Sequence, residues 1–203
     1  RAVFVYLANQ VLPELGGRSL ATGSTRLKAW SVGCASGEEP YTLALVWHFL
    51  VARRLPELEL RILGTDIDET LLNRAKQACY SAGTLKAVPP EWLASAFEDT
   101  ERGSRLQPAI TDHVRFQRHD VRMGPPNGDF DLVLCRNLAF TYFDDALQHT
   151  TARVLHRSLR EGGALVLGAH EILPASAAGF TAWSSPHAIY RKLPRTRAGG
   201  ASR

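Results

Sequence analysis

Acidic side chains gather where the sequence predicts the ends of buried strands. The first of these strands ends in the stretch "WSVGCASGEEPYTLAL", residues 30–45, in which a small-residue loop leads from the strand into two glutamates and an apolar helix. This order of strand, glycine loop and helix is typical of a nucleotide-binding turn. A phosphate group at such a turn is favoured by backbone amides and positive charge. Acids at the strand ends therefore argue against a phosphorylated ligand.

The complete set of acids after the apolar runs indicates a cationic ligand. They are Glu38, Glu39, Asp66, Asp68, Asp120 and Glu171, and the only fixed cation that we count among them is Arg136. S-adenosylmethionine (AdoMet) has a sulfonium, an ammonium and a ribose, and it has no phosphate. Glycines at the loop would let the backbone approach this cofactor, and an acid after the second strand is where related folds bind a ribose diol.

Several of these acids also have a purely structural interpretation. Ser36 and Glu39 have the spacing of a capping box, in which Ser36 would begin the helix. Asp66 could cap the next helix, and Asp120 could form a turn. Cys34 and Cys135 are interpreted as small buried residues, and neither is assigned a nucleophilic role.

Composition and charge limit the class of protein. The 203 residues are 45% apolar and 22% charged, which is ordinary for a globular domain. The net charge of +4 comes from the end of the chain, because the residues before Tyr190 have a net charge of −1. We therefore expect a disordered basic tail over 194–203 and no nucleic-acid partner.

The sequence lacks the patterns of metal sites, disulfide frameworks, membrane spans and secretory signals. The three cysteines are far apart without a CxxC pair, and the seven histidines show no metal-ligand spacing, so we expect no metal site and a cytoplasmic location. No apolar run reaches the roughly 18 residues of a membrane span, and no secretory signal opens the chain. The chain also lacks an initiator Met, from which we expect a fragment of a longer protein.

Alternating helical and extended patterns predict a mostly parallel sheet with helices on both faces. Helices are expected over 3–15, 38–54, 69–79 and 144–160, the last closed by Gly162-Gly163, and a loop over 16–25. Strands are expected over 26–33, 59–66, 113–120, 130–135 and 164–169, and a terminal hairpin over 180–184 and 188–193. Residues 80–112 are punctuated by Pro and Gly, which indicates a small inserted subdomain.

Three motifs in this order carry a family resemblance. "WSVGCASGEEPYTLAL", "ILGTDIDETLLNRAKQACY" and "FDLVLCRNLAFTYFD" resemble the chemotaxis receptor methyltransferases (CheR-type), which are AdoMet-dependent protein-glutamate O-methyltransferases. The resemblance implies a Rossmann-like class I AdoMet methyltransferase domain over residues 1–193. It also implies a chemoreceptor-like protein acceptor, and a receptor tail held at the 80–112 subdomain in some members.

The resemblance also implies roles for individual residues. Those assigned to the cofactor are Gly33, Ala35, Glu38 and Glu39 at its methionine end, Asp66 on the ribose, Asp120 and Val121 at the adenine, and Asn137 and Leu138 beneath the methionine. Those assigned to the reacting end are Arg136, Asn137 and Tyr142. The family usually has three residues between its Cys-Arg-Asn and Tyr-Phe-Asp segments, whereas "LAFT" is four, and one residue turns a helical side chain by about 100°.

The chemistry expected without the resemblance agrees with a carboxylate acceptor. A glutamate side chain is already ionised at neutral pH and needs no general base, and the sequence offers no Ser/His/Asp or Cys/His set. Three alternatives remain open: another protein or small-molecule acceptor, a non-catalytic AdoMet-binding module, and a nicotinamide-dependent oxidoreductase. The spacing of "LAFT" and the family's helical docking domain, which falls outside this chain, motivate the first alternative.

Overall fold

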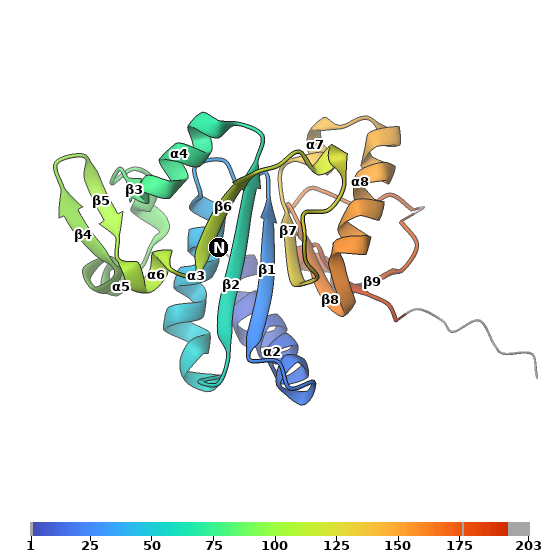
Figure 1. The fold of residues 1–203 in the computed structure, drawn as a ribbon, viewed down its shortest axis with the longest axis horizontal. Helices are drawn as coiled ribbons and strands as arrows, with labels where there is room; N and C mark the ends of the chain where they lie inside the picture. Colours follow the sequence, from blue (N-terminus) through green and yellow to red (C-terminus); the bar gives the residue numbers. More distant parts are fainter. Residues whose placement is uncertain (1, 176, 195–203) are drawn as a thin grey trace, which may run out of the picture.

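A seven-stranded sheet forms the centre of the computed structural model, which describes residues 2–175 and 177–194 (Figure 1). Its order is β6-β2-β1-β7-β8-β10-β9. The strands are β1 (Arg26–Val32), β2 (Glu59–Asp66), β6 (Val114–Arg118), β7 (Phe130–Cys135), β8 (Leu159–Leu167), β9 (Phe180–Ser184) and β10 (Ile189–Lys192). β10 pairs antiparallel with both β8 and β9, whereas the other pairs are parallel. The predicted mostly parallel sheet and its terminal hairpin are therefore confirmed.

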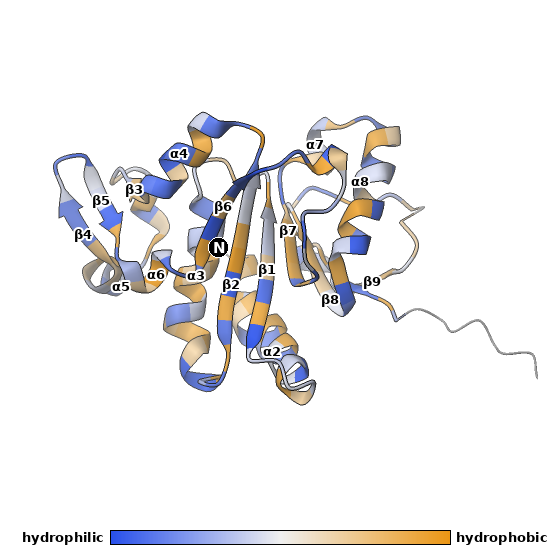
Figure 2. Ribbon diagram, viewed as in Figure 1, coloured by the Kyte–Doolittle hydropathy of each residue, from blue (hydrophilic) through white to orange (hydrophobic). Residues whose placement is uncertain are grey.

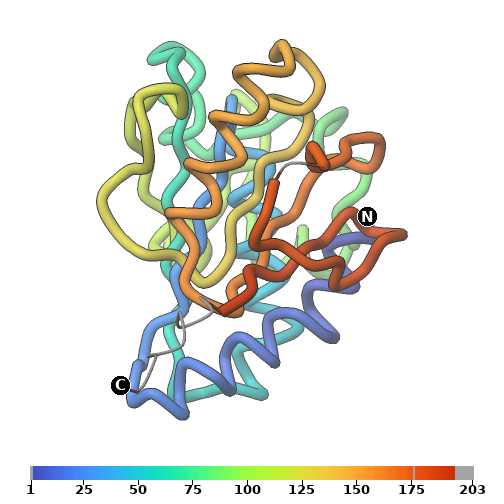
Figure 3. The backbone as a smooth tube through the Cα atoms, turned by 90° about the vertical axis from the view of Figure 1, so that its right-hand side faces the viewer, coloured from blue at the N-terminus to red at the C-terminus, as the bar shows by residue number. Residues whose placement is uncertain are grey.

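Helical segments connect and cover the strands. They are α1 (Ala2–Tyr6), η1 (Leu7–Val11), α2 (Leu12–Ala21), α3 (Glu38–Val46), η2 (Trp47–Val51), η3 (Ala52–Arg54), α4 (Glu69–Gln77), η5 (Val121–Met123), α7 (Ala139–Tyr142), α8 (Asp145–Ser158) and η6 (Ser185–His187). In Figure 3 the N-terminal helices, in blue, run along the lower edge of the view. The helix α8, in orange, lies separately above them.

The central strands are buried on both faces, as a parallel sheet requires. Along β7, Leu132 and Leu134 belong to the core on the side of α3 and the N-terminal helices, whereas Val133 and Cys135 pack with α8 on the other side. Figure 2 shows apolar residues, in orange, along the central strands β2 and β7. Two helical layers therefore fix the sheet from both sides.

Residues 79–112 form the inserted subdomain beside β6. It contains β3 (Cys79–Tyr80), η4 (Thr84–Ala87), α5 (Pro90–Ala96), β4 (Phe97–Thr100), β5 (Gly103–Leu106) and α6 (Pro108–Thr111). Its three strands make an antiparallel sheet in the order β3-β5-β4. The excursion predicted over 80–112 covers these elements except for Cys79 at the start of β3.

Two predicted boundaries are wrong. The loop expected from residue 16 begins only after Ala21, because Gly16 lies inside α2 where a Cβ would meet the Leu55 side chain at 2.5 Å. Gly162 and Gly163 do not close α8 but lie inside β8, at a register irregularity opposite the start of β7. There the Arg18 guanidinium covers Gly162 and donates to the carbonyl oxygen of Glu161 at 3.0 Å, which leaves no room for a Cβ. The tail predicted over 194–203 lies, apart from Pro194, outside the described residues.

Candidate functional site

A cavity of about 170 Å³ lies at the carboxyl ends of β1, β2 and β6, beside the segment that follows β7. From β1 the chain first adds β2 and β6 on one side of the sheet, and it then returns to add β7 and β8 on the other side. The strands β1 and β7 therefore flank the topological switch point. Open α/β sheets bind ligands at this place. The lining residues are Val32, Gly33, Asp66, Ile67, His119, Asp120, Val121, Arg122, Leu138 and Phe143. Of the predicted site residues, Gly33, Asp66, Asp120, Val121 and Leu138 therefore lie together.

Gly33 gives the cavity a floor without a side chain. Its φ of +65° is in the left-handed region that favours glycine. A Cβ at Gly33 would lie 2.6 Å from the Cδ2 atom of Leu138, so the Leu138 side chain passes directly over the glycine. The loop after β1 and the segment after β7 are thus in contact at this point.

Asp66 links the end of β2 to the glycine loop. Its Oδ2 atom accepts a hydrogen bond from the backbone amide of Ala35 at 2.9 Å, and Oδ1 accepts one from the amide of Asp68 at 2.9 Å. Asp66 is half-buried, and two backbone amides fix the direction of its carboxylate toward the cavity. Asp68, rather than Asp66, caps the next helix, through its bonds to the amides of Thr70 and Leu71.

Asp120 has a cationic partner that the sequence argument did not include. Its carboxylate accepts hydrogen bonds from Nε and Nη2 of Arg122, and these bonds hold the pKa of Asp120 below its ordinary value. It also caps η5 by accepting from the Arg122 amide. The assignment of Arg136 as the only fixed cation at the strand ends is therefore wrong, since Arg122 also lines the cavity.

Glu39 does not form the alternative capping box. The residue before α3 is Gly37, with φ of +88° and no side-chain cap, so Ser36 does not begin the helix. The Glu39 carboxylate accepts from the hydroxyl of Ser31 at 2.8 Å and from Nη1 of Arg136 at 3.0 Å. Burial raises the pKa of Glu39, against the opposing effect of Arg136. Glu38, by contrast, is exposed at the first turn of α3.

Arg136 and Glu39 form an ion pair between the end of β7 and the start of α3. Both side chains are about four-fifths buried, and the Arg136 guanidinium also lies 5.5 Å from the ring centre of Phe4 in α1. The Arg136 Nε atom is buried without a hydrogen-bond partner. The N-terminal helix is thereby joined to the segment that carries Asn137 and Leu138.

Asn137 and Tyr142 are exposed, and neither lines the cavity. Asn137 has a left-handed φ of +55°. The Tyr142 side chain is 76% exposed at the end of α7, whereas the next residue, Phe143, lines the cavity. Thr141, one residue earlier, donates its hydroxyl to Glu171 at 2.7 Å. Tyr142 follows the four-residue "LAFT" segment, in which the sequence has one residue more than the family usually has. The role assigned to Tyr142 is therefore the one that this extra residue affects.

Sequence reasoning missed several residues of this site. Tyr80, from the inserted subdomain, donates its hydroxyl to the carbonyl oxygen of Ser36 at 2.8 Å and so anchors the glycine loop. His119 and Phe143 line the cavity, and the Nε2 atom of His119 lies 2.9 Å from the carbonyl oxygen of Gly124. Their positions beside the predicted Asp120 and Tyr142 are the only sequence signal that could have indicated His119 and Phe143.

The comparison with known families identifies the fold. The family model described as "CheR methyltransferase, SAM binding domain" matches residues 1–189. The chain belongs to this family. Its membership confirms the predicted Rossmann-like class I AdoMet methyltransferase fold, the AdoMet cofactor and the CheR resemblance.

In several similar proteins the region that matches this CheR domain is part of a longer chain. The "Chemotaxis protein methyltransferase" of Listeria monocytogenes is 33% identical over 165 residues, covering 81% of this chain and 60% of that protein. "Chemotaxis protein methyltransferase 1" of Pseudomonas aeruginosa is 33% identical over 175 residues, covering 84% and 62%. An "Uncharacterized 104.1 kDa protein" of Rhodobacter capsulatus is 34% identical over 194 residues, covering 94% of this chain and 20% of that protein. The chain therefore spans about three fifths of the two methyltransferases.

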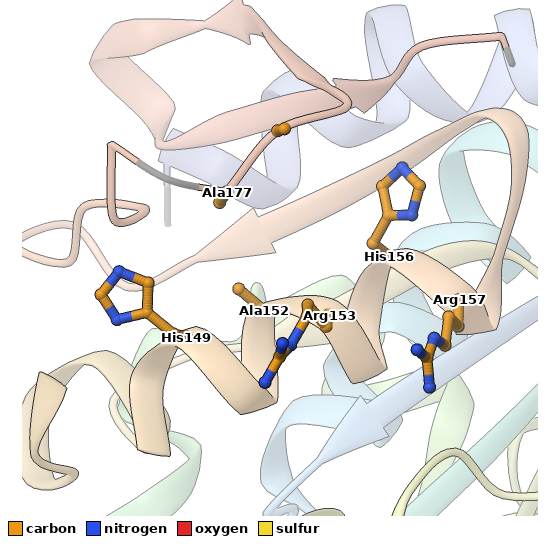
Figure 4. Close-up of a pocket in the computed structure, with 7 residues that line it drawn as sticks. His149, Ala152, Arg153, His156, Arg157 and Ala177 are labelled. Carbon is orange, nitrogen blue, oxygen red and sulfur yellow. The ribbon is translucent and has the colours of Figure 1, made fainter. Parts of the chain in front are cut away.

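A second cavity of about 360 Å³ lies against α8, away from the glycine loop of the CheR domain (Figure 4). Its lining includes His149, Arg153, His156 and Arg157, together with alanines of the segment before β9. In Figure 4 the two histidines and the two arginines extend from different sides of the helix and do not converge. Among the described residues that line it there is no glycine and no carboxylate, so this lining does not fit the cofactor.

No helix among the described residues has the length and apolar character needed to cross a membrane. Within the same residues, no group of three or more His, Cys, Asp or Glu side chains is arranged to hold a metal ion.

Proposed function

We propose that this CheR domain transfers the methyl group of AdoMet to the side-chain carboxylate of a protein glutamate. The products are a glutamate methyl ester and S-adenosylhomocysteine (AdoHcy). The observation that carries the proposal is the cavity at the β1/β7 switch point, which is lined by the Gly33 floor and the oriented Asp66 carboxylate in a chain of the CheR family. AdoMet supplies an electrophilic methyl group on its sulfonium when it is bound.

The cavity fits the adenosine part of the cofactor. Asp66 would accept hydrogen bonds from the ribose hydroxyls, because each of its oxygens has a lone pair beyond the one taken by an amide. Val121 is buried beside Asp120, and these two residues would lie against the adenine. Gly33, Ala35, Glu38 and Glu39 would line the methionine end, where a negative charge suits the cofactor's ammonium and sulfonium.

Residues after β7 would lie at the reacting end. Asn137 and Leu138 would support the methionine part, while Arg136 and Tyr142 would face the acceptor. The Arg136 guanidinium has a fixed place between Glu39 and Phe4, and Tyr142 is exposed and free to contact an incoming protein. Methyl transfer is an in-line displacement, so the main task of these residues is to align the acceptor and to exclude water.

A carboxylate acceptor agrees with the side chains that line the cavity. Asp66 is engaged by two amides, Asp120 by Arg122, and His119 lies within hydrogen-bond distance of a carbonyl oxygen. Among the described residues lining the cavity, none is paired as a base with a nucleophile. A glutamate is ionised at neutral pH and needs no base, whereas an alcohol acceptor would have to lose a proton.

The acceptor that we propose is a chemoreceptor-like protein, because the Listeria and Pseudomonas relatives carry the name of chemotaxis protein methyltransferases. A cytoplasmic location and the absence of a nucleic-acid partner remain predictions from the sequence. The identity of the methyl acceptor distinguishes this proposal from an enzyme with another acceptor. Methylation of any acceptor distinguishes it from a non-catalytic binding module.

Incubation with AdoMet labelled in its methyl group tests the proposal. The acceptors are a chemoreceptor fragment with glutamates at its methyl-accepting positions and a matched fragment with glutamines there. We expect label on the glutamate fragment alone, released as methanol in mild base. Base-stable label would indicate a nitrogen or sulfur acceptor. AdoHcy binding by calorimetry without any labelling would favour a binding module, and NAD is the control ligand for the oxidoreductase alternative.

A further inference from the structure

Glu171 is a buried carboxylate that the proposed reaction does not use. It follows β8, and the sequence suggested that its charge would add to an acidic rim around the ligand. Its side chain is only 4% exposed, and it does not line the cavity. Burial of a carboxylate is costly unless hydrogen bonds compensate for the lost water.

Four donors from three segments converge on this carboxylate. Oε2 accepts from the amides of Asn137 at 2.8 Å and Gly168 at 2.7 Å, and Oε1 accepts from the amide of Leu138 at 3.1 Å and the Thr141 hydroxyl at 2.7 Å. Three of the four are backbone amides, which can only donate, so the arrangement needs two acceptor oxygens. The charge of Glu171 is thus directed into the protein and not toward a ligand.

The backbone that Glu171 holds is in an uncommon conformation. Asn137 has φ of +55°, in the left-handed region that few non-glycine residues adopt and that asparagine adopts more readily than most. Such a conformation persists where its surroundings over-determine it. Two successive amides, of Asn137 and Leu138, point at one carboxylate, and this sets the course of the chain as it leaves β7.

Gly168 leaves room for Glu171 to contact the segment after β7. A Cβ at Gly168 would lie 2.5 Å from the Asn137 Oδ1 atom and 2.7 Å from Glu171 Oε2. The glycine therefore permits the end of β8 to approach the segment after β7. At the other end of that segment, Leu138 lies over Gly33 on the cavity floor.

We propose that Glu171 is a positioning residue for the cofactor site. By fixing the Asn137 and Leu138 amides it places the Leu138 side chain against Gly33, and so sets the methionine end of the cavity before AdoMet binds. The inference rests on the proposed function for the identity of the site, but it concerns cofactor binding and can be measured without methyl transfer.

The test compares the affinity of the whole chain for AdoHcy in three variants by calorimetry. Glu171→Gln replaces one acceptor oxygen with an amide donor that faces backbone amides, and we expect binding at least 10-fold weaker. Asp131→Asn is the matched control. Asp131 is also a buried carboxylate on β7, bound to the Lys28 amide and to Arg160, but it lies at the opposite end of the strand. It should lower the melting temperature and leave AdoHcy affinity within twofold.

Thr141→Val keeps the proposal testable if Glu171→Gln does not fold. It removes one of the four donors without placing a new donor beside the carboxylate, and we expect a 2- to 5-fold weaker affinity. In the amide NMR spectrum of Glu171→Gln, the Asn137, Leu138 and Gly168 resonances should move from their wild-type positions. Unchanged AdoHcy affinity in the folded variants would overturn the inference, as would an equal loss in Asp131→Asn. If wild-type binds AdoHcy but transfers no methyl group, the proposed reaction fails and the positioning role is still tested.

Discussion

The Asp66 carboxylate and the Ala35 backbone amide are 2.9 Å apart and join two strand ends that are separated by 31 residues in the sequence. This bond closes one side of the cavity, because Ala35 belongs to the loop after β1 and Asp66 ends β2. A carboxylate held in this way loses little conformational freedom when a ligand binds. It is therefore better placed to bind a diol than a mobile surface acid would be.

Asp66→Ala should weaken AdoHcy binding by about 1–3 kcal/mol, the range for hydrogen bonds to a charged group. This corresponds to roughly 5- to 150-fold in the dissociation constant. Calorimetric titration measures the change. Asp68→Asn is the control, because Asp68 is exposed, lies outside the cavity and caps α4, a position at which asparagine is equally suitable. Equal affinity in Asp66→Ala and wild-type would rule out Asp66 as the ribose ligand.

Gly33→Ala should both destabilise the fold and weaken AdoHcy binding. The positive φ costs an alanine about 1–2 kcal/mol, and its Cβ would also displace the Leu138 side chain from a distance of 2.6 Å. Gly17→Ala is the matched control, since a Cβ there meets nothing within 4 Å in α2. It should stabilise the chain by about 0.5–1 kcal/mol. Urea denaturation measures the free energy of unfolding of both variants, which should fall in Gly33→Ala and rise in Gly17→Ala. A rise in Gly33→Ala would mean that the cavity floor has room for a side chain at this position.

The sequence predicted the elements of the fold because most of their patterns are local. The continuous apolar run of β7 and the helical period of residues 38–54 are visible without tertiary contacts. The edge that carries the cavity was also predictable, since the carboxyl ends of parallel strands meet on one side of a sheet. The place of Gly162 was not, because it depends on Arg18, which is 144 residues away.

The partners of the acids could not be predicted in the same way. Glu39 pairs with Arg136 across 97 residues, and Glu171 binds the Asn137 amide across 34. Such contacts depend on side-chain directions that only the packed sheet defines. The acidic rim expected from the sequence is consequently weaker in the structure, because Glu39, Asp120 and Glu171 are compensated by cations or amides.

The stability of the chain should depend on pH through Glu39. Burial raises its pKa in the folded protein above the ordinary value of 4.5. Between these two values the folded state holds a proton that the unfolded state has lost, so stability falls as the pH rises. The contribution is complete below pH 4.5 and is lost as the pH passes the folded pKa.

Urea denaturation of wild-type and Glu39→Gln across pH 4.5–8 isolates this effect. The free energy of unfolding of wild-type, relative to the variant, should decrease with rising pH and then become constant. Ser31→Ala retains the carboxylate and should retain the pH dependence, because it removes only the hydroxyl that donates to Glu39. A wild-type-minus-variant difference that does not change with pH would mean that Glu39 titrates normally in the folded chain.

Alkylation of the folded chain at pH 8 should modify Cys79 and spare Cys34 and Cys135. Burial raises the pKa of the Cys34 thiol to about 12, with a further contribution from the charge of Asp66, and burial also raises the pKa of Cys135 to about 12. Because the thiolate is the reactive form, only on the order of 10⁻⁴ of either group is reactive at pH 8. Cys79 is half-buried in β3, and its thiol lies 3.7 Å from the Thr100 hydroxyl.

Mass spectrometry after iodoacetamide treatment should find one modified cysteine in buffer and three in urea, and none in folded Cys79→Ser. Rapid modification of Cys34 in the folded protein would mean that the glycine loop opens, and that the bond between Ala35 and Asp66 does not hold it closed.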